Sequence, residues 1–515
     1  MIVADQSEVI AFLSRPETYG AEDVRRIDTH ISAVFLAGPK AYKLKRAVVF
    51  PYLDFGTLER RRKFCEAEVA INRRTAPQIY ERVAAVTREA GGALALDGAG
   101  APVDFVVVMR RFDDSGLFDR LAEKGALSDE LMRQLGDEIA RFHQAAERRL
   151  DSGGYDGMAK VVALNAQDLA RHAQTILDAA AVSRIASRSQ AEAARVRAVL
   201  EARRKAGFVR RCHGDLHLRN ICLYENRPLL FDAIEFSEDL ACIDILYDLA
   251  FLLMDLEHRG LRRLGNLVFN RYLAQGGEVL ANLAGLAALP LFLSCRAAVR
   301  AHVGGDAALL QRDDAEKSRL IAESQAYLDL AGRVIAPPPP RFVAVGGLSG
   351  TGKSTLARAL APEIEPVPGA VVLRSDTIRK RLWGVDEFTR LPPEAYAQPV
   401  TARVYGAIAD QAQAALAAGH SVIADAVHAR GEERAALERL ATTLSVPFTG
   451  LWLEAPETEL ERRVGGREPD ASDATVAVLR RQLELPLGDM TWRRVDAAGG
   501  ALATLAAARA ALSSS

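Results

Sequence analysis

The sequence has no excess charge of either sign and few cysteines. Its 515 residues include 66 basic and 67 acidic side chains, which leave a net charge of −1. This balance gives no electrostatic reason to expect a dedicated binder of nucleic acid or of a membrane surface. The cysteines form no C-x-x-C pair, so we expect no disulfide framework and a reducing, cytoplasmic location. The five are Cys65, Cys212, Cys222, Cys242 and Cys295.

Long apolar runs are also absent. No uninterrupted apolar stretch reaches the ~18 residues that a membrane span needs. The N-terminal segment carries Asp5 and no long apolar core, unlike a signal peptide. Hydrophobic residues make up 49% of the chain and charged residues 26%, which excludes a largely disordered or fibrous protein. At roughly 100–200 residues per domain, the length predicts two to four globular domains.

Four consecutive prolines mark the clearest division of the chain. Pro337–Pro340 cannot lie inside a helix or a central strand and favours a stiff, extended spacer. A charged amphipathic helix is predicted just before it, over Asp313–Val334, and a buried strand just after it, over Phe342–Val345. We therefore predict one domain over residues 1–336 and another over residues 341–515, joined by the proline linker 337–340.

The first domain is predicted to divide into a β-rich lobe and a helical lobe. A hairpin is predicted over residues 31–45, and a buried strand over Val103–Met109. These place a small lobe over about residues 1–112. From about residue 113 to residue 336 the pattern is mostly helical, interrupted by a strand-and-loop region over Val209–Phe236.

The candidate chemistry of the first domain is concentrated in one string. Asp215 and Asn220 lie five residues apart within His213–Asn220, and Asp232 follows twelve residues later at the end of a predicted strand. Phosphoryl transfer needs a carboxylate that orients and deprotonates the attacking hydroxyl, and oxygen ligands that hold Mg²⁺ against the phosphates of ATP. One loop and the next strand end supply both, at the spacing of a kinase catalytic loop.

This string, His-Gly-Asp-x-x-x-x-Asn, resembles that of the aminoglycoside phosphotransferase-like family. The resemblance implies that Asp215 is the catalytic base, that Asn220 and Asp232 bind Mg²⁺, and that ATP is the phosphoryl donor. Asp232 is followed by Ala233-Ile234 rather than Phe-Gly, and no A-P-E segment follows. These departures favour a small-molecule kinase over a protein kinase. The alternative is that the polar residues of the string only cap a turn.

A kinase of this type also needs a cation over the α- and β-phosphates, usually paired with a helical glutamate. Lysine is scarce, with 10 residues in the chain, and three of them fall in the predicted hairpin. Strand alternation places Lys43 and Lys45 on one face. We prefer Lys43 as the phosphate-binding lysine, with Lys45 in reserve; the alternative is an exposed edge strand with solubilising lysines. Glu66 is the preferred partner, and Glu68 is the alternative.

Two further regions of the first domain bear on its ligands. In the family that it resembles, the residues at Met109 form the hinge whose backbone binds adenine. The region after Asp232 is acidic, and it would suit the cation of an amino-sugar, although caps and solvated helix faces are the commoner explanation. Asp248 in particular is predicted to be structural. The acidic residues are Glu235, Glu238, Asp239, Asp244, Asp248 and Asp255.

The second domain opens with a phosphate-binding loop. Residues 347–354 read Gly-Leu-Ser-Gly-Thr-Gly-Lys-Ser and fit G-x-x-x-x-G-K-[ST] between a predicted strand and a predicted helix. Glycines let backbone N–H groups surround the phosphates at a helix N-terminus. Lys353 would reach the β- and γ-phosphates, and the Ser354 hydroxyl would bind Mg²⁺. The predicted nucleotide contacts are Gly347, Gly350, Thr351, Gly352, Lys353, Ser354 and Thr355.

The rest of this domain predicts a parallel α/β sheet with ligands at the carboxyl ends of the strands. It resembles the P-loop small-molecule and polynucleotide kinases, in which a D-x-x-R element follows the second strand. The resemblance implies that Asp376 is the base for the acceptor hydroxyl and that Arg379 contacts the acceptor or a phosphate. It also implies that Asp425 holds the metal through water; a plain strand-end carboxylate is the alternative. The further predicted strands are Val371–Asp376, His420–Asp425 and Phe448–Leu453.

A lid is suggested by Glu459–Arg467. Arg463 and Arg467 lie four residues apart and share one face if the helix continues. There they could stabilise the charge of the transferring phosphoryl group. The alternative is a solvated helix end. The triplet at residues 472–474, Ser-Asp-Ala, is also similar to related sequences, with no evident mechanism.

Together these observations predict an α+β two-lobed, protein-kinase-like phosphotransferase domain followed by an α/β P-loop NTPase domain with a parallel sheet. We expect a bifunctional cytoplasmic enzyme in which each domain uses ATP and Mg²⁺ to phosphorylate a hydroxyl of a small molecule. In one alternative the second domain is a polynucleotide 5′-hydroxyl kinase, which the even charge disfavours. In another, one domain is a nucleotide sensor that regulates the other. Neither the acceptors nor the oligomeric state follows from the sequence.

Overall fold

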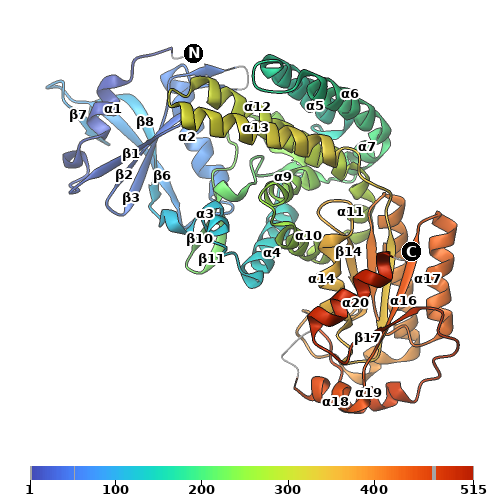
Figure 1. Cartoon of the computed structure of the whole chain (residues 1–515). Helices are drawn as coiled ribbons and strands as arrows, with labels where there is room; N and C mark the ends of the chain where they lie inside the picture. The colour runs from blue at the N-terminus through green and yellow to red at the C-terminus, as the bar shows by residue number, and fades with distance from the viewer. Residues whose placement is uncertain (1–2, 30, 51–52, 467–470, 514–515) are drawn as a thin grey trace. The chain divides into compact units, whose positions relative to one another are not determined.

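The chain forms two compact units in a computed structural model (Figure 1). The structure describes residues 3–29, 31–50, 53–466 and 471–513. One unit comprises Met1–Gly157 and Arg204–Leu252, and the other comprises Met158–Arg203 and Leu253–Ser515.

The first unit is built on a six-stranded antiparallel sheet in the order β1-β2-β3-β8-β6-β7. Alternating apolar residues such as Phe35, Leu44 and Val106 send side chains to one face, where helix α1 covers them. Helix α2 packs on the other face through Cys65 and Val69. The predicted hairpin and buried strand are both present. The elements are α1 (Ser7–Leu13), β1 (Val24–Asp28), β2 (Ser32–Ala37), β3 (Lys40–Lys45), β4 (Val49–Phe50), β5 (Leu53–Asp54), α2 (Leu58–Asn72), β6 (Tyr80–Arg88), β7 (Leu94–Leu96) and β8 (Ala101–Arg110).

The strand-and-loop region predicted over Val209–Phe236 contains the short strand β9 and a tight hairpin of two strands, β10 and β11. Strands β10 and β11 pair with Ile221 opposite Leu230. The two turn residues, Glu225 and Asn226, have φ of 49° and 62°, the left-handed pair that a two-residue hairpin turn requires. The elements are α3 (Phe118–Glu123), α4 (Asp129–Ala145), β9 (Val209–Arg211), β10 (Ile221–Tyr224), β11 (Arg227–Leu230), α8 (Glu238–Ala241), β12 (Cys242–Asp244) and α9 (Ile245–His258).

The second unit contains a group of helices that precedes the proline segment. Helices α12 and α13 pack along one another, and the Ser294 hydroxyl of α12 donates to the Ala331 carbonyl of α13. Among the described residues, the stretch Val279–Leu310 has the length and apolarity of a membrane span, but 67% of its apolar window is buried within the structure. The helices are α5 (Gly154–His172), α6 (Ala179–Arg195), α7 (Arg197–Lys205), α10 (Arg262–Gln275), α11 (Val279–Gly285), α12 (Leu289–Leu310) and α13 (Asp314–Val334).

The same unit contains a five-stranded parallel sheet in the order β14-β15-β13-β16-β17. The phosphate-binding loop leaves the central strand β13, and the predicted parallel α/β architecture is confirmed. One prediction was wrong in detail, because β14 ends at Arg374 and Asp376 lies in the first turn of α15. The elements are β13 (Phe342–Gly347), α14 (Lys353–Leu360), β14 (Val371–Arg374), α15 (Ser375–Leu382), α16 (Gln398–Ala417), β15 (Val422–Asp425), α17 (Gly431–Leu444), β16 (Phe448–Glu454), α18 (Glu457–Gly465), α19 (Val476–Leu483), β17 (Arg493–Asp496) and α20 (Ala501–Ser513).

Helix α10 covers the edge strand β14 within the second unit. The side chain of Asn270 accepts a hydrogen bond from the Val372 amide at 2.7 Å and donates to the Ala370 carbonyl at 3.1 Å. Asn266 donates to the same carbonyl at 3.1 Å. Two asparagine side chains thus occupy backbone groups that an edge strand would otherwise offer to another chain.

Candidate active sites

The predicted phosphate-binding lysine of the first unit lies between two carboxylates. Lys43 is in the middle of β3, and its Nζ is 2.8 Å from Glu68 Oε1 of α2 and 2.6 Å from Asp232 Oδ1. Burial by itself lowers the pKa of Lys43, but the charges of Asp232 and Glu68 raise it well above its usual range. Burial likewise raises the pKa of Glu68, and the neighbouring lysines more than reverse this. Both groups are therefore charged at neutral pH.

The preference for Glu66 was wrong, because the partner of Lys43 is Glu68. The side chain of Glu66 is 54% exposed and pairs with Arg62 four residues earlier on the same helix. Glu68 lies two residues, or about 200°, further around the helix, on the face that packs against the sheet. Its side chain is fully buried. Helix geometry alone separates the two glutamates.

The string around Asp215 folds into a loop that brings its polar groups together. The side chain of Asn220 donates from Nδ2 to Asp215 Oδ2 at 2.8 Å and to the Asp215 carbonyl at 2.9 Å. This use of the amide nitrogen leaves the amide oxygen as the ligand atom of Asn220. The next hairpin places Phe231 beside Asn220, with its amide 3.0 Å from the Asn220 carbonyl. Asp232 follows directly, so the hairpin explains how twelve residues of separation become proximity.

Asp248 of α9 anchors this loop, as the predicted structural role requires. Its two carboxylate oxygens accept from the backbone amides of His213 and Gly214 at 3.0 and 2.9 Å. Gly214 has a φ of 85°, a left-handed conformation that favours glycine. The buried His213 ring donates from Nε2 to the Phe231 carbonyl, and its Nδ1 accepts from the Asp215 amide. Burial lowers the pKa of His213, in agreement with this neutral ring.

The oxygen groups of Asn220 and Asp232 fit Mg²⁺, which prefers hard oxygen ligands. The Asp232 carboxylate is 40% exposed, and its Oδ1 contacts Lys43. Its backbone φ is 62°. The amide of Asp232 donates to the Tyr80 hydroxyl, and the next amide donates to Asn72 Oδ1. The loop that carries the predicted metal ligand is therefore tied to both β6 and α2.

Three further polar residues belong to this site: Lys45, which the sequence analysis held in reserve, and Glu235 and His217, which it gave no individual role. Lys45 Nζ contacts Glu68 Oε2 at 2.5 Å and also pairs with Glu235. His217 lies beside the predicted base, with Nε2 3.4 Å from Asp215 Oδ2 and its ring edge-on to Phe251. The even spacing of Lys43 and Lys45 on one strand was the available signal for the first of these.

Met109 lies within the sheet rather than beyond its end. It is register-paired with Ala41 on β3 and Tyr80 on β6. The last backbone bonds of this strand end come from the amides of Arg110 and Arg111, which donate to Ile79 and Pro39. The adenine contact at Met109 stays a prediction.

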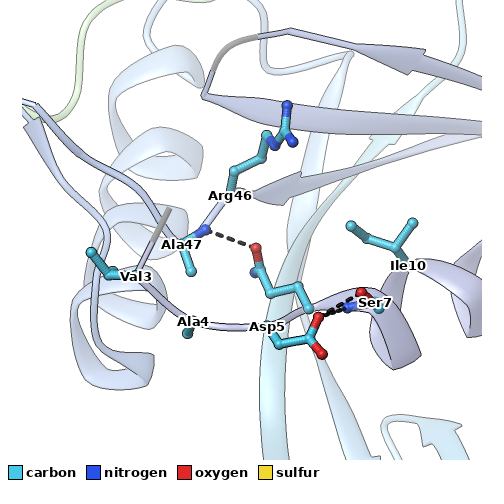
Figure 2. A pocket seen from close by; sticks show the side chains of 8 residues that line it. Val3, Ala4, Asp5, Ser7, Ile10, Arg46 and Ala47 are labelled. Carbon is cyan, nitrogen blue, oxygen red and sulfur yellow. Dashed lines mark hydrogen bonds between the residues drawn. The ribbon is translucent and has the colours of Figure 1, made fainter. Parts of the chain in front are cut away.

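A shallow pocket on the first unit lies apart from these groups. Figure 2 shows it between the N-terminal segment and the residues that follow β3. Gln6 spans it: its Oε1 accepts from the Ala47 amide, and its Nε2 donates to the Lys45 carbonyl. Gln6 thereby fixes the end of β3. The lining residues are Val3, Ala4, Asp5, Gln6, Ser7, Ile10, Arg46 and Ala47, and no predicted site residue is among them.

The phosphate-binding loop of the second unit has the predicted strand-loop-helix form. Helix α14 begins at Lys353, so Ser354 and Thr355 lie in its first turn. Gly347, Gly350 and Gly352 all have positive φ. A Cβ at Gly350 would lie 2.8 Å from the Leu460 carbonyl, so only glycine fits this turn. The ammonium of Lys353 and the hydroxyl of Thr351 both donate to the Leu348 carbonyl.

Two carboxylates and an arginine gather beside this loop. Arg374 at the end of β14 lies 3.8 Å from both Asp376 Oδ2 and Asp425 Oδ2. Burial raises the pKa of Asp376; Arg374 opposes this rise and Asp425 adds to it. Asp425 is buried, and its Oδ2 accepts no hydrogen bond from the part of the chain that the structure describes. A buried carboxylate oxygen of this kind fits a metal-bound water.

Arg379 and Asp473 fix the segment between α15 and α16. Arg379 donates to the Ala395 carbonyl at 2.6 Å, and its guanidinium lies 4.8 Å from the centre of the Tyr396 ring. Asp473, the centre of the Ser-Asp-Ala triplet, accepts from Lys380 Nζ, the Leu391 amide and the Tyr396 hydroxyl. The triplet therefore has a structural role that its sequence did not reveal. The acceptor contact of Arg379 stays a prediction.

The predicted phosphate contact of Arg463 is not supported. Its guanidinium binds Glu459 on the same helix and donates to the carbonyls of Ala497, Ala498 and Gly499. These bonds fasten α18 to the turn between β17 and α20, which supplies the three carbonyls. Arg467 lies outside the described residues.

The comparisons with known proteins match both halves of this description. Residues 54–289 match the phosphotransferase enzyme family, and residues 342–485 match an AAA domain family. The chain is thus a fusion of a phosphotransferase domain with a P-loop kinase-like domain. It belongs to the same family as uncharacterized proteins of Mycobacterium tuberculosis and Mycobacterium bovis. It is 30% identical to each over 488 residues, which cover 93% of this chain and 92% of theirs.

Each of the following solved structures resembles one part of the chain. A gluconokinase from Sinorhizobium meliloti 1021 is 23% identical and covers 34% of this chain and 93% of its own, with a TM-score of 0.25. A choline/ethanolamine kinase family protein from Mesorhizobium loti is 14% identical and covers 64% of this chain and 98% of its own, with a TM-score of 0.35. These likenesses leave the acceptors open.

Proposed function

We propose that the chain is a bifunctional ATP-dependent kinase, in which each domain transfers the γ-phosphoryl of ATP to a hydroxyl of a small molecule. The observation that carries the proposal is the gathering of Lys43, Glu68, Asp215, Asn220 and Asp232 in one unit. The second unit adds its own phosphate-binding loop. The presence of phosphoryl-transfer groups in both units supports two reactions over one.

In the first site, Lys43 binds the phosphates of ATP, and Glu68 holds the lysine in place. Asn220 and Asp232 would hold Mg²⁺, which neutralises charge on the β- and γ-phosphates. Asp215 accepts the proton of the acceptor hydroxyl as its oxygen attacks the γ-phosphorus. Asn220 orients this carboxylate through its amide hydrogen bond.

In the second site, the backbone amides of the glycine loop and Lys353 bind the phosphates. Ser354 and Asp425 would hold Mg²⁺, Asp425 through water, and the ion supplies the same charge neutralisation. Asp376 takes the proton of the second acceptor, and its raised pKa favours this role as a base. Arg379 contacts the acceptor or the transferring phosphoryl group.

We further propose hydroxyl-bearing metabolites such as sugars or amino-sugars as acceptors, and a cytoplasmic location. The even charge supports small acceptors over nucleic acid. The five cysteines are free and buried, which fits a reducing compartment. A polynucleotide acceptor for the second site and a sensing role for either site are outcomes of the following test.

The test measures ADP release by the full chain against sugars, amino-sugars, nucleosides and 5′-hydroxyl oligonucleotides. Asp215→Ala should lower turnover on one acceptor class by about 10²–10⁴-fold, the range for a lost general base. Lys353→Ala should abolish turnover on another class. The matched controls, Asp156→Ala and Arg439→Ala, replace exposed residues of like charge and should retain both activities.

The pattern of losses separates the alternatives. If each variant loses its own acceptor class, the chain has two kinase activities. If one variant loses nothing on any acceptor, that site is a sensor or is idle, and the bifunctional assignment is wrong. Activity on 5′-hydroxyl oligonucleotides that disappears with Lys353→Ala would make the second domain a polynucleotide kinase.

A further inference from the structure

The first site contains a linear network of five side chains that alternate in charge. Asp232 contacts Lys43 at 2.6 Å, Lys43 contacts Glu68 at 2.8 Å, and Glu68 contacts Lys45 at 2.5 Å. Lys45 then pairs with Glu235. The two end residues of this network lie on the segment that follows β11, and its three middle residues lie on β3 and α2. Glu68 joins the two halves because each of its oxygens binds one lysine.

The two ends of this network differ in their access to water. Asp232 is 40% exposed and Lys43 is 13% exposed, so the outer end can exchange partners with a ligand. Lys45 is 1% exposed and Glu235 is 6% exposed. Although burial lowers the pKa of Lys45, Glu235 and Glu68 raise it above its usual range, so this lysine stays charged. A buried charge without its partner is strongly unfavourable, so the inner end is fixed.

The inner end holds the segment that carries the predicted metal ligand. Glu235 lies three residues after Asp232, and the backbone between them has no regular structure. When Asp232 turns from Lys43 to a divalent cation, Lys43 keeps Glu68, and Lys45 keeps both Glu68 and Glu235. Burial raises the pKa of Glu235, and the charge of Lys45 opposes this rise. With all five groups ionised, three carboxylates and two ammonium groups leave one negative charge, which favours a cation at the exposed end. The exchange at Asp232 can therefore occur while the segment stays bound to β3.

We propose that Glu235, acting through Lys45, is a positioning residue for the divalent cation at Asp232. It does not touch the cation or the nucleotide. It fixes the segment after β11 against β3 and α2, so that Asp232 is held where Asn220 supplies the second ligand. The proposal rests on the function proposed above for the first unit.

The test is the Mg²⁺ dependence of ATP binding by the full chain, measured by calorimetry at pH 8. All proteins carry Lys353→Ala, which removes nucleotide binding at the other site. Glu235→Gln keeps the size of the side chain and removes its charge. It should raise the Mg²⁺ concentration for half-maximal ATP binding about tenfold or more, the usual effect of losing a partner outside the ligand sphere. ATP binding without Mg²⁺ should change less than about twofold.

The matched control is Glu81→Gln. Glu81 also pairs with a lysine of β3, Lys40, at 2.9 Å, but the two side chains are 40% (Lys40) and 30% (Glu81) exposed, far more than Lys45 and Glu235. Its Mg²⁺ dependence should equal that of the parent. If Glu235→Gln melts below the assay temperature, Glu235→Asp serves instead, because it keeps the charge and withdraws it by one methylene. It should show a smaller rise in the same direction.

The outcomes distinguish the two proposals. An unchanged Mg²⁺ dependence in the folded Glu235 variant, together with a loss in Asp232→Asn, overturns the positioning role and leaves the kinase assignment intact. Equal ATP binding by the parent and Asp232→Asn overturns both, because the first unit then has no nucleotide site of this kind. A loss of ATP binding that is the same with and without Mg²⁺ would make Glu235 merely structural and would also overturn the inference.

Discussion

The two glutamates of helix α2 illustrate how much depends on one side chain. Glu66 and Glu68 are the same residue type and lie two residues apart, so neither residue type nor distance along the sequence from β3 shows which one pairs with Lys43. The buried face of α2 distinguishes them, because Glu68 lies on it and Glu66 does not. Arg61, Cys65, Glu68 and Asn72 follow the spacing of a single helical face. The apolar Cys65 and Val69 were the available sequence signal, because they flank Glu68 on that face.

Replacing each glutamate in turn should affect ATP binding at the first site differently. Glu68→Gln removes the charge that both lysines share, so it should weaken ATP binding at the first site by about tenfold or more and lower the melting temperature. Glu66→Gln should bind ATP like the parent, because Glu66 pairs with the exposed Arg62 on the same helix and not with Lys43. The measurement is an ATP titration of the full chain with Lys353→Ala. Weaker binding by Glu66→Gln than by Glu68→Gln would refute the assignment.

A buried histidine should make the stability depend on pH. His420 precedes β15, and its Nε2 lies 3.0 Å from the Gly369 carbonyl. Burial lowers its pKa to about 4, below the unfolded value of about 6.5. The unfolded chain therefore binds the proton first. The contribution to stability is complete above about pH 6.5 and decreases as the pH falls toward 4.

The expected slope is about 1.4 kcal/mol per pH unit between pH 6 and 4.5. Urea unfolding at several pH values measures it. His420→Gln keeps an amide donor for Gly369 and removes the titration, so its unfolding free energy should fall less steeply than that of the parent over this range. Parallel pH profiles for the two proteins would show that His420 does not carry the effect.

Elements were predicted best where their pattern was strong. The β2–β3 hairpin, the buried strand β8 and the parallel strands β13, β14, β15 and β16 follow from apolar periodicity and glycine signals. The edge strand β17 was not predicted. Strand β1 was not predicted, because none of its residues is buried and its sequence carries charge. The end of β14 was misplaced by two residues, since Ser375 and Asp376 suit a helix start as well as a strand end.

The same limit applies to the sites. Contiguous strings, such as His213–Asn220 and the glycine loop, were found because one loop carries them. Lys45, Glu235 and Asp473 act through partners that are distant in sequence: Glu235 is 190 residues from Lys45, and Asp473 is 93 residues from Lys380. Only tertiary packing brings such groups together, so no local pattern reports them.

Asp473 should hold the segment between α15 and α16. Lys380 is nearly fully buried, so Asp473→Asn leaves its charge without a partner. The unfolding free energy should fall by about 3 kcal/mol, the order expected for a broken buried pair, and proteolysis between residues 383 and 397 should accelerate. Asp386→Asn is the control, because Asp386 lies exposed in the same segment. Equal cleavage rates for the two variants would contradict the role of Asp473.

At the scale of the whole molecule, the cover that α10 gives to β14 is the feature that no sequence pattern predicted. The predicted division at the four prolines leaves α10 on one side and β14 on the other, yet both lie in one compact unit. The contact is specific, because Asn266 and Asn270 bind backbone groups and Arg271 pairs with Glu387 at 2.6 Å.

Separating the two should expose the sheet edge. Residues 341–515 expressed alone should self-associate, because β14 then presents unpaired backbone groups. The full chain, which retains α10 and the helices packed around it, should not self-associate through this edge. Light scattering coupled to size-exclusion chromatography measures both proteins. A 341–515 fragment that is monomeric at the concentrations where the full chain is also monomeric would refute this account.

The asparagines of α10 also bear on how such a fusion persists in evolution. A flexible tether between two enzymes can be cut by a single gene-fission event with little loss. In this protein, a split of the gene at the prolines would separate β14 from α10. New residues would then be needed to cover the backbone groups of β14 and prevent self-association. The two domains are therefore expected to be inherited together in one gene, whatever ligands each of them binds.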